Sequence, residues 1–193
     1  MKPIKLALFA SGTGSNAESI IRYFEHKSTV EVVFVLSNKV HAPIVEKATS
    51  LGVHVVVCSN QEVEDTSYLV QLCQAHQIDY IILAGFLRKI PDTLIQTYPE
   101  KIINIHPSLL PKYGGAGMYG LKVHQAVKEA GETESGITIH YVSEHFDEGQ
   151  RIAQFYTTIS ETDSPDEIQQ KIHQLERTYF PIVVEKEINR FIQ

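Results

Sequence analysis

Short apolar runs without polar alternation recur through the first half of the chain, and segments with helical spacing separate them. The runs cover residues 4–10, 31–37, 53–57 and 80–84. A strand that is apolar on both sides is buried on both faces, which is typical of a parallel sheet covered by helices. Helices are expected between the strands at residues 16–27, 43–52 and 65–77. The pattern predicts a doubly wound, mostly parallel, Rossmann-like α/β fold.

The chain changes character after a fifth predicted strand at residues 101–106. A loop rich in glycine and proline precedes a predicted helix at 123–130. Two further strands, 137–142 and 151–158, flank a turn at Asp147-Glu148-Gly149, so we expect an antiparallel hairpin at one edge of the sheet. Ser164-Pro165-Asp166-Glu167 combines an N-cap serine, a first-turn proline and a capping-box glutamate, which predicts a long C-terminal helix.

Composition excludes several classes of protein. The length of 193 residues suits one α/β domain, expected over residues 1–193, and the formal net charge of -6 argues against a nucleic-acid surface. No apolar run approaches the ~20 residues of a membrane span, and the N-terminus enters a strand without signal-peptide form. Cys58, Cys73 and the histidines lack metal-ligand spacing. We therefore expect a cytoplasmic protein that holds no metal.

A glycine-rich loop, Ser11-Gly12-Thr13-Gly14-Ser15-Asn16, links the first strand to a helix. Glycines let the backbone approach a ligand, and free N–H groups at a helix start favour an anion, most often phosphate. The spacing also fits a dinucleotide fingerprint, but Leu36, Ser37 and Asn38 stand where an acidic ribose ligand is needed. No Walker lysine follows. The remaining alternative is a tight turn that binds nothing.

Asn104 and His106 end the fifth strand before Pro107. Alternate strand residues share a face, so the amide and the imidazole point the same way. The amide can polarise a carbonyl, and the imidazole can move a proton near neutral pH. An acyl-transfer site without a covalent intermediate fits this pair, although such a pair often only satisfies backbone groups in a loop.

The string Asn104-Ile105-His106-Pro107-Ser108-Leu109-Leu110-Pro111 resembles the signature of the folate-dependent formyltransferase family, and the resemblance covers nearly the whole chain. The loop at 11–16 resembles the phosphate loop of one branch of that family. Leu83 to Arg88 resembles the folate-side loop, and Gly136 to Val142 with Phe146 to Gly149 resembles the stretch that carries an aspartate. The resemblance implies formyl transfer from 10-formyltetrahydrofolate, and the loop and length select the branch that uses glycinamide ribonucleotide in purine synthesis.

The resemblance also assigns site residues, with the ribotide phosphate on the half up to about residue 100 and the folate and chemistry on the remainder. The catalytic residues it implies are Asn104, His106 and Asp147. For ribotide phosphate and amine it implies Gly12, Thr13, Gly14, Ser15, Asn16 and Glu176, and for folate Leu87, Arg88, Lys89, Ile90, His140 and Ser143. Only small-molecule partners are expected, with no nucleic acid or membrane, and the protein is expected as a monomer or homodimer.

Simpler interpretations stand beside these roles. From the residues alone, Asp147 is a turn former, Arg88 an exposed loop residue and Glu176 a solvated helix charge. The rival functions are another folate-dependent formyltransferase, a formylfolate hydrolase, or a non-catalytic nucleotide-binding domain. The sequence departs from the family pattern in the longer loop 114–120 and at Gln150-Arg151, where proline is common. The turn and the resemblance predict a cis Leu110–Pro111 bond.

Overall fold

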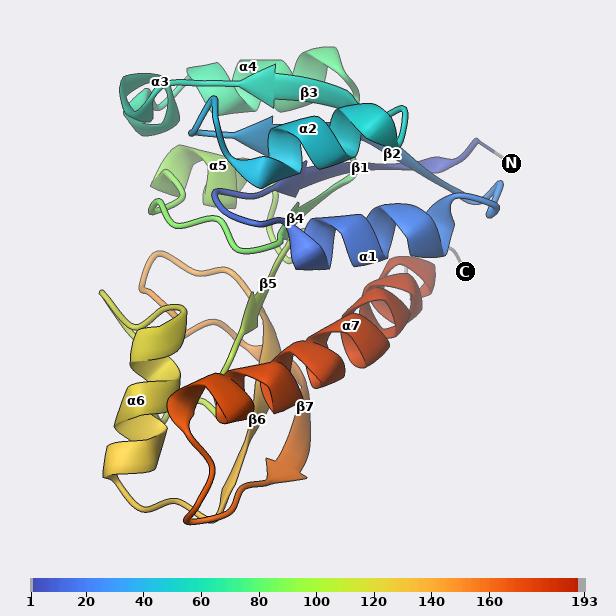
Figure 1. The fold of residues 1–193 in the computed structure, drawn as a ribbon. Helices are drawn as coiled ribbons and strands as arrows, with labels where there is room; N and C mark the ends of the chain where they lie inside the picture. Colours follow the sequence, from blue (N-terminus) through green and yellow to red (C-terminus); the bar gives the residue numbers. More distant parts are fainter. Residues whose placement is uncertain (1, 191–193) are drawn as a thin grey trace.

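The computed structural model describes residues 2–190. Their seven strands form one sheet, with helices packed against it (Figure 1). The strand order is β3-β2-β1-β4-β5-β6-β7. The first five strands are parallel, and β6 and β7 run antiparallel to their neighbours. Their bounds are Ile4–Phe9 (β1), Val30–Ser37 (β2), His54–Val57 (β3), Tyr80–Leu83 (β4), Ile102–His106 (β5), Glu134–Tyr141 (β6) and Arg151–Thr158 (β7). The predicted mostly parallel sheet with an antiparallel hairpin at one edge is confirmed.

Helices cover both faces of the parallel half. They are α1 (Ser15–Phe24), α2 (Pro43–Ser50), α3 (Asn60–Glu64), α4 (Tyr68–Ala75) and α5 (Asp92–Thr97). The sequence prediction missed α3 and α5, because five and six residues are too short to show helical periodicity. Local capping explains α3, since the Ser59 and Glu62 side chains satisfy each other's backbone N–H groups.

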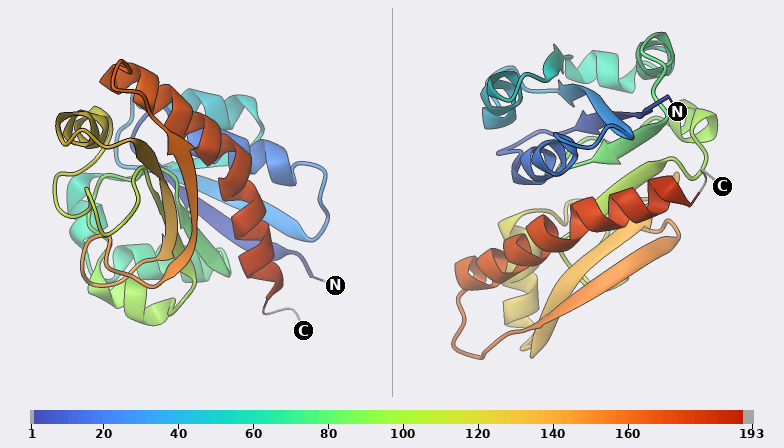
Figure 2. Two further views of the ribbon diagram at one scale, coloured as in Figure 1. Left: turned by 90° about the horizontal axis from the view of Figure 1, so that it is seen from below. Right: turned by 90° about the vertical axis from the view of Figure 1, so that its right-hand side faces the viewer.

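The second half adds α6 (Leu121–Glu129), the β6–β7 hairpin and the 25-residue α7 (Pro165–Asn189). β6 begins earlier than predicted because Glu134 to Gly136 already pair with β7. Figure 2 shows this half beside the first half of the chain, with β5 at the junction and α7 lying along the sheet. The two halves therefore share one sheet and one long helix.

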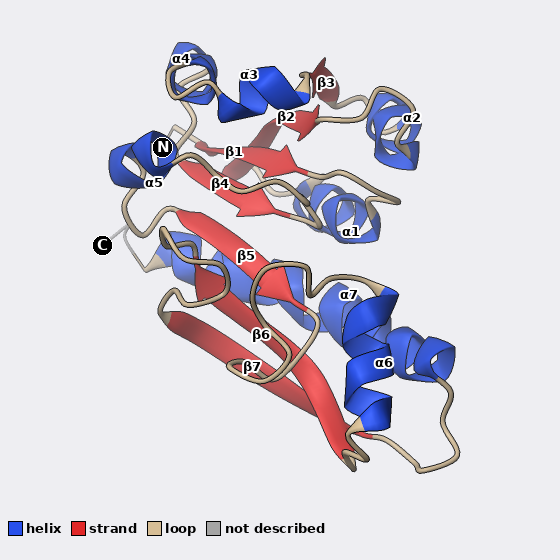
Figure 3. Ribbon diagram, turned by 90° about the vertical axis from the view of Figure 1, so that its left-hand side faces the viewer, coloured by secondary structure: helices blue, strands red, loops and turns tan. Residues whose placement is uncertain are grey.

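Two apolar clusters lie on opposite faces of the sheet. One joins Leu6, Leu8 and Ile103 to α1, α2 and α7, and the other joins Phe9 and Ile81 to α3, α4 and α5. Over β5, β6 and β7, the face opposite α7 is covered by loops that follow β5 and β6 (Figure 3). A layer of loops leaves room for a ligand where a packed helix would not.

Among residues 2–190, no helix is both long and apolar enough to cross a membrane. That part of the chain also holds no group of three or more His, Cys, Asp or Glu side chains arranged to bind a metal ion.

The N-terminus of α7 gives a stability prediction. The Glu167 N–H donates to Ser164 Oγ at 3.3 Å, and the Ser164 N–H donates to Glu167 Oε2 at 2.7 Å. Replacing Ser164 with Ala removes the N-cap acceptor, which costs about 1 kcal/mol and lowers Tm by about 2–4 °C. Thermal unfolding measures the change.

The matched control is Ser50→Ala, because the Ser50 hydroxyl lies in the last turn of α2 and donates to Lys47 O. Its free energy of unfolding should stay within about 0.5 kcal/mol of the starting protein. Equal losses at Ser50 and Ser164 would contradict the capping argument.

Candidate active site

One cavity of about 500 Å³ runs along the carboxyl edge of the parallel strands, where ligands bind in open α/β sheets. Its walls come from the loop after β1, the loop after β4, the end of β5, the loops after β5 and β6, and α7. Every residue predicted for the site lines this cavity. The folded chain thus brings together residues that lie far apart in the sequence.

The loop before α1 lines the cavity where β1 ends. Gly14 is the N-cap residue in the left-handed region at φ 70, and a Cβ there would lie 2.4 Å from Ile44 Cδ1. Only glycine allows both that backbone angle and that approach. The first N–H groups of a helix have no intrahelical acceptor, so the start of α1 offers donors to an anion.

Ser11 connects this loop to neighbouring segments. Its hydroxyl donates to Asn38 Oδ1 at 2.6 Å and accepts the Leu87 N–H at 3.0 Å. Asn38 directly follows β2, at the position where a dinucleotide-binding fold needs a carboxylate. Its amide oxygen already accepts a hydrogen bond from Ser11. This arrangement favours a phosphate site over a dinucleotide site.

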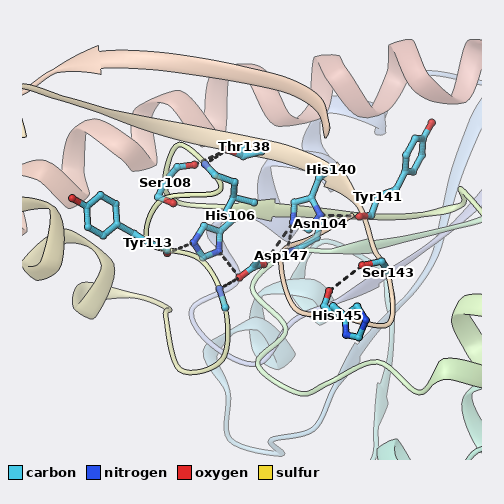
Figure 4. A network of polar contacts seen from close by, with 12 residues as sticks. Asn104, His106, Ser108, Tyr113, Thr138, His140, Tyr141, Ser143, His145 and Asp147 are labelled. Carbon is cyan, nitrogen blue, oxygen red and sulfur yellow. Dashed lines mark hydrogen bonds and ion pairs between the residues drawn. The ribbon is translucent and has the colours of Figure 1, made fainter. Parts of the chain in front are cut away.

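The β5–β6 register places Asn104 beside His140 and His106 beside Thr138 (Figure 4). His140 Nδ1 lies 2.8 Å from the carbonyl oxygen of Tyr141, so Nδ1 carries the proton and donates. His140 Nε2 is then the acceptor for Asn104 Nδ2 at 3.1 Å. This contact orients the Asn104 amide and leaves its second N–H available for a ligand.

His106 and Asp147 meet across the loops, although forty residues of sequence separate them. His106 Nδ1 lies 3.4 Å from Asp147 Oδ2, and His106 Nε2 lies 2.8 Å from the carbonyl oxygen of Tyr113. Asp147 Oδ2 also accepts the Gly115 N–H at 2.9 Å, and Oδ1 lies 3.6 Å from His140 Nε2. The predicted proximity of Asp147 to His106 is therefore present.

Burial governs the charge state of this pair. It lowers the pKa of His106, and the nearby Asp147 carboxylate and Tyr113 carbonyl offset that effect only in part. Burial also opposes ionisation of Asp147, but its contacts with His140, His106 and Gly115 outweigh it, so its pKa lies below the usual value. The carboxylate acts on His106 in the expected direction, yet the net shift of the histidine is downward.

Backbone geometry explains the Asp-Glu-Gly sequence of the turn. Asp147 has a φ of 58°, a left-handed conformation that aspartate tolerates better than most residues. A Cβ at Gly149 would lie 1.7 Å from the carbonyl oxygen of Tyr141. Gln150 O then accepts the Tyr141 N–H at 2.9 Å, so the turn closes without proline. The same residue, Asp147, therefore forms the turn and places its carboxylate beside His106.

Glu176 projects from α7 into the cavity wall beside the start of α1. Burial raises its pKa to about 7, and the neighbouring Asn16 and Arg177 favour the ionised form. It is only 6% exposed, which rules out the solvated helix charge that its helical position alone indicated. A buried carboxylate at a ligand cavity is suited to a cationic or amine group.

The loop after β4 forms another part of the cavity wall, next to the loop before α1. Leu87 is half exposed and Ile90 is buried, while Arg88 pairs with Glu64 and Lys89 lies 3.2 Å from Asp92. Across from this loop, Ser143 Oγ donates to the His145 carbonyl at 3.0 Å. This part of the wall combines apolar surface with side chains that are already paired within the protein.

Sequence reasoning missed several cavity residues. Gln169 and His173 precede Glu176 on α7 at a spacing that places all three on one helix face, so this signal was present. Loop 115–120, whose contacts the resemblance did not supply, also lines the cavity, as does the buried His124. The predicted cis Leu110–Pro111 bond is confirmed.

Comparison with known proteins gives consistent matches. The family model described as formyl transferase matches residues 4–184. The chain is 39% identical over 186 residues to the chloroplastic phosphoribosylglycinamide formyltransferase of Arabidopsis thaliana, covering 93% of this chain and 64%, under two thirds, of that protein. It is 37% identical over 187 residues to the phosphoribosylglycinamide formyltransferase of Bacillus subtilis (strain 168), covering 94% and 93%.

Solved structures agree with the sequence matches. The phosphoribosylglycinamide formyltransferase of Streptococcus pneumoniae TIGR4 superposes with a TM-score of 0.84 at 34% identity, covering 96% of this chain and 98% of that chain. The enzyme of the same name from Bacillus halodurans gives a TM-score of 0.85 at 33% identity, covering 94% of each chain. Sequence, fold and cavity together show that the chain belongs to the formyl transferase family.

Proposed function

We propose that this protein transfers the formyl group of 10-formyltetrahydrofolate to the amine of glycinamide ribonucleotide in purine biosynthesis. One observation carries the proposal: a single cavity joins an anion-binding helix start, a buried carboxylate, the Asn104–His106–Asp147 cluster and an apolar loop. The names of its relatives support the choice of acceptor. The proposal includes one domain over residues 1–193, a cytoplasmic location, and a monomer or homodimer with small-molecule substrates.

Each end of the cavity suits one substrate. The ribotide phosphate accepts backbone N–H groups between Gly12 and Asn16, and Glu176 receives the substrate amine. The pteridine of the folate lies against Leu87 to Ile90 and the His140–Ser143 segment, where apolar surface is available. Arg88 and Lys89 stand at this end, near the carboxylates of the folate tail. The reacting groups then meet over Asn104 and His106.

The chemistry requires stabilisation of one developing charge and transfer of one proton. The amine nitrogen bonds to the formyl carbon, and the carbonyl oxygen becomes an oxyanion. Asn104 donates to that oxygen, as does His106 once it is protonated at Nδ1, and such a donor contributes about 3 kcal/mol. Asp147 stabilises the imidazolium and relays the amine proton through water. The bond from the formyl carbon to N10 of the folate breaks, and N10 receives the proton.

The rival functions use the same fold with different acceptors. A hydrolase or a sugar formyltransferase would release or transfer formyl without the ribotide, and a non-catalytic domain would leave formylfolate unchanged. Consumption of 10-formyltetrahydrofolate is measured with and without glycinamide ribonucleotide. Turnover only in its presence, with formylated ribotide as product, is expected. Equal consumption without ribotide would replace this proposal with a hydrolase.

Gly12 tests the anion loop. A Cβ at Gly12 meets no atom within 4 Å, so Gly12→Ala leaves the protein packing intact while it adds a methyl group at the cavity wall. Loss of charge-assisted hydrogen bonds should raise the ribotide KM by about tenfold or more. The folate KM in the same variant is the internal control, and an unchanged ribotide KM would remove this loop from the site.

Asn104→Ala and His106→Ala test the chemical step. Each removes a donor to the developing oxyanion, so kcat should fall by ~10² or more while both substrates still bind. Steady-state kinetics and equilibrium binding measure the two effects separately. Near-normal turnover in either variant would assign that side chain to structure alone.

Asp147→Asn tests the electrostatic pair through pH. The carboxylate raises the proton affinity of His106, so removing the charge should lower the His106 pKa further. A step that needs protonated His106 loses rate as pH rises through that pKa, so the alkaline fall in kcat should move to lower pH. The control is Asp163→Asn, a carboxylate paired with Lys171. Identical pH profiles for all three proteins would refute the pairing.

A further inference from the structure

We propose that the Tyr113 hydroxyl and Glu132 are positioning residues that hold the Tyr113 carbonyl against His106 Nε2 and so make Nδ1 the nitrogen that exchanges the proton. The catalytic consequence rests on the proposed function, whereas the tautomer of His106 is a property of the free protein. Neither the Tyr113 hydroxyl nor Glu132 is among the groups that the proposed chemistry uses.

The backbone at Tyr113 has an unusual conformation. Its φ is 56°, a left-handed conformation that bulky residues rarely adopt. In this conformation its carbonyl oxygen lies 2.8 Å from His106 Nε2 (Figure 4). A conformation of this kind persists where the surrounding contacts determine it.

Those contacts converge on Glu132, in the turn between α6 and β6. Tyr113 Oη donates to Glu132 Oε1 at 2.9 Å, and Lys112 Nζ lies 2.7 Å from the same oxygen. Both hydrogen bonds lower the pKa of Glu132, so it is ionised at neutral pH. The buried Ser108 donates to the carbonyl of Lys112 at 2.6 Å. The peptide before Tyr113 and the ring of Tyr113 are thus fixed at separate points.

The two nitrogens of His106 face different partners. Because Nε2 faces a carbonyl oxygen, it must carry a proton, and Nδ1 of the neutral ring then presents its lone pair near Asp147 Oδ2 at 3.4 Å. A proton gained at Nδ1 is stabilised by that carboxylate. His140 on β6 also lowers the pKa of this ring, and the ring in turn lowers the pKa of His124 on α6.

We call the hydrogen bond between the Tyr113 hydroxyl and Glu132 the anchor. Without it, Tyr113 can relax to a more favourable φ and move its carbonyl away from His106 Nε2. Neutral His106 would then place its proton on Nδ1, toward Asp147, and could no longer accept one there. Loss of the Tyr113–Glu132 hydrogen bond should therefore lower kcat, as does loss of any group that sets the tautomer of a catalytic histidine. The Glu132–Tyr113 contact therefore acts on the reaction through His106 and does not itself touch the reacting atoms.

Nitrogen-15 NMR of the free protein tests the tautomer directly. His106 should carry its neutral-state proton on Nε2 in the starting protein. Tyr113→Phe, which keeps the ring, and Glu132→Ala should each shift His106 toward the Nδ1–H tautomer and lower its pKa. The controls are Glu129→Gln, an exposed glutamate at the end of α6, and Tyr156→Phe, an exposed tyrosine on β7. Retention of the Nε2–H tautomer in Tyr113→Phe would overturn the proposal.

Kinetics then separate positioning from general structural damage. Each variant should lower kcat by about tenfold while both KM values change by less than about twofold. The double variant should be no slower than the slower single variant, because both act through one contact. Multiplicative losses would contradict the proposal. If the starting protein fails to formylate the ribotide, the proposed function fails, and the NMR result still decides the role of the anchor.

Discussion

The antiparallel pairing of β5 with β6 is the interaction on which the site depends. With the five parallel strands alone, β5 would be the sheet edge, and Asn104 and His106 would lack their β6 partners His140 and Thr138. Pairing with β6 sets Asn104 opposite His140 and His106 opposite Thr138. Because side chains alternate along both strands, these four polar groups share a face and the intervening isoleucines enter the core on the other. The register therefore sets the orientation of the amide before any ligand arrives.

The second constraint is the low exposure of the ionisable groups. His106 is 4% exposed and Glu176 is 6% exposed, so each charge depends on a few directed contacts. In such surroundings a backbone group can influence a side chain as strongly as a charged neighbour does. Gly115 N–H on Asp147 and the Tyr113 carbonyl on His106 are contacts of this kind. A loop that looks like a simple connection in the sequence thereby takes part in the electrostatics of the site.

The sequence predicted the parts of this molecule that side-chain pattern determines. Buried strands and the shared face of Asn104 and His106 follow from local periodicity, and the cap at Ser164 follows from a capping-box motif. Asp147 did not, since turn chemistry explains an Asp-Glu-Gly segment equally well, and only family resemblance selected it. The Tyr113 carbonyl was beyond any such method, because its direction depends on a positive φ that a tyrosine seldom adopts. The helices α3 and α5 were missed because five and six residues are too short to show helical periodicity, and α3 is held by its capping box.

The long α7 helix connects the two halves of the chain along one cavity. It packs against α1 at one end of the sheet and against α6 and the β6–β7 hairpin at the other. Glu176 on this helix contacts Asn16 at the start of α1, whereas Gln169 and His173 extend along the same cavity. A helix rigidly attached to both halves fixes the distance between their binding regions. In the proposed reaction, Glu176 beside Asn16 holds the substrate amine at a fixed distance from the phosphate at the start of α1.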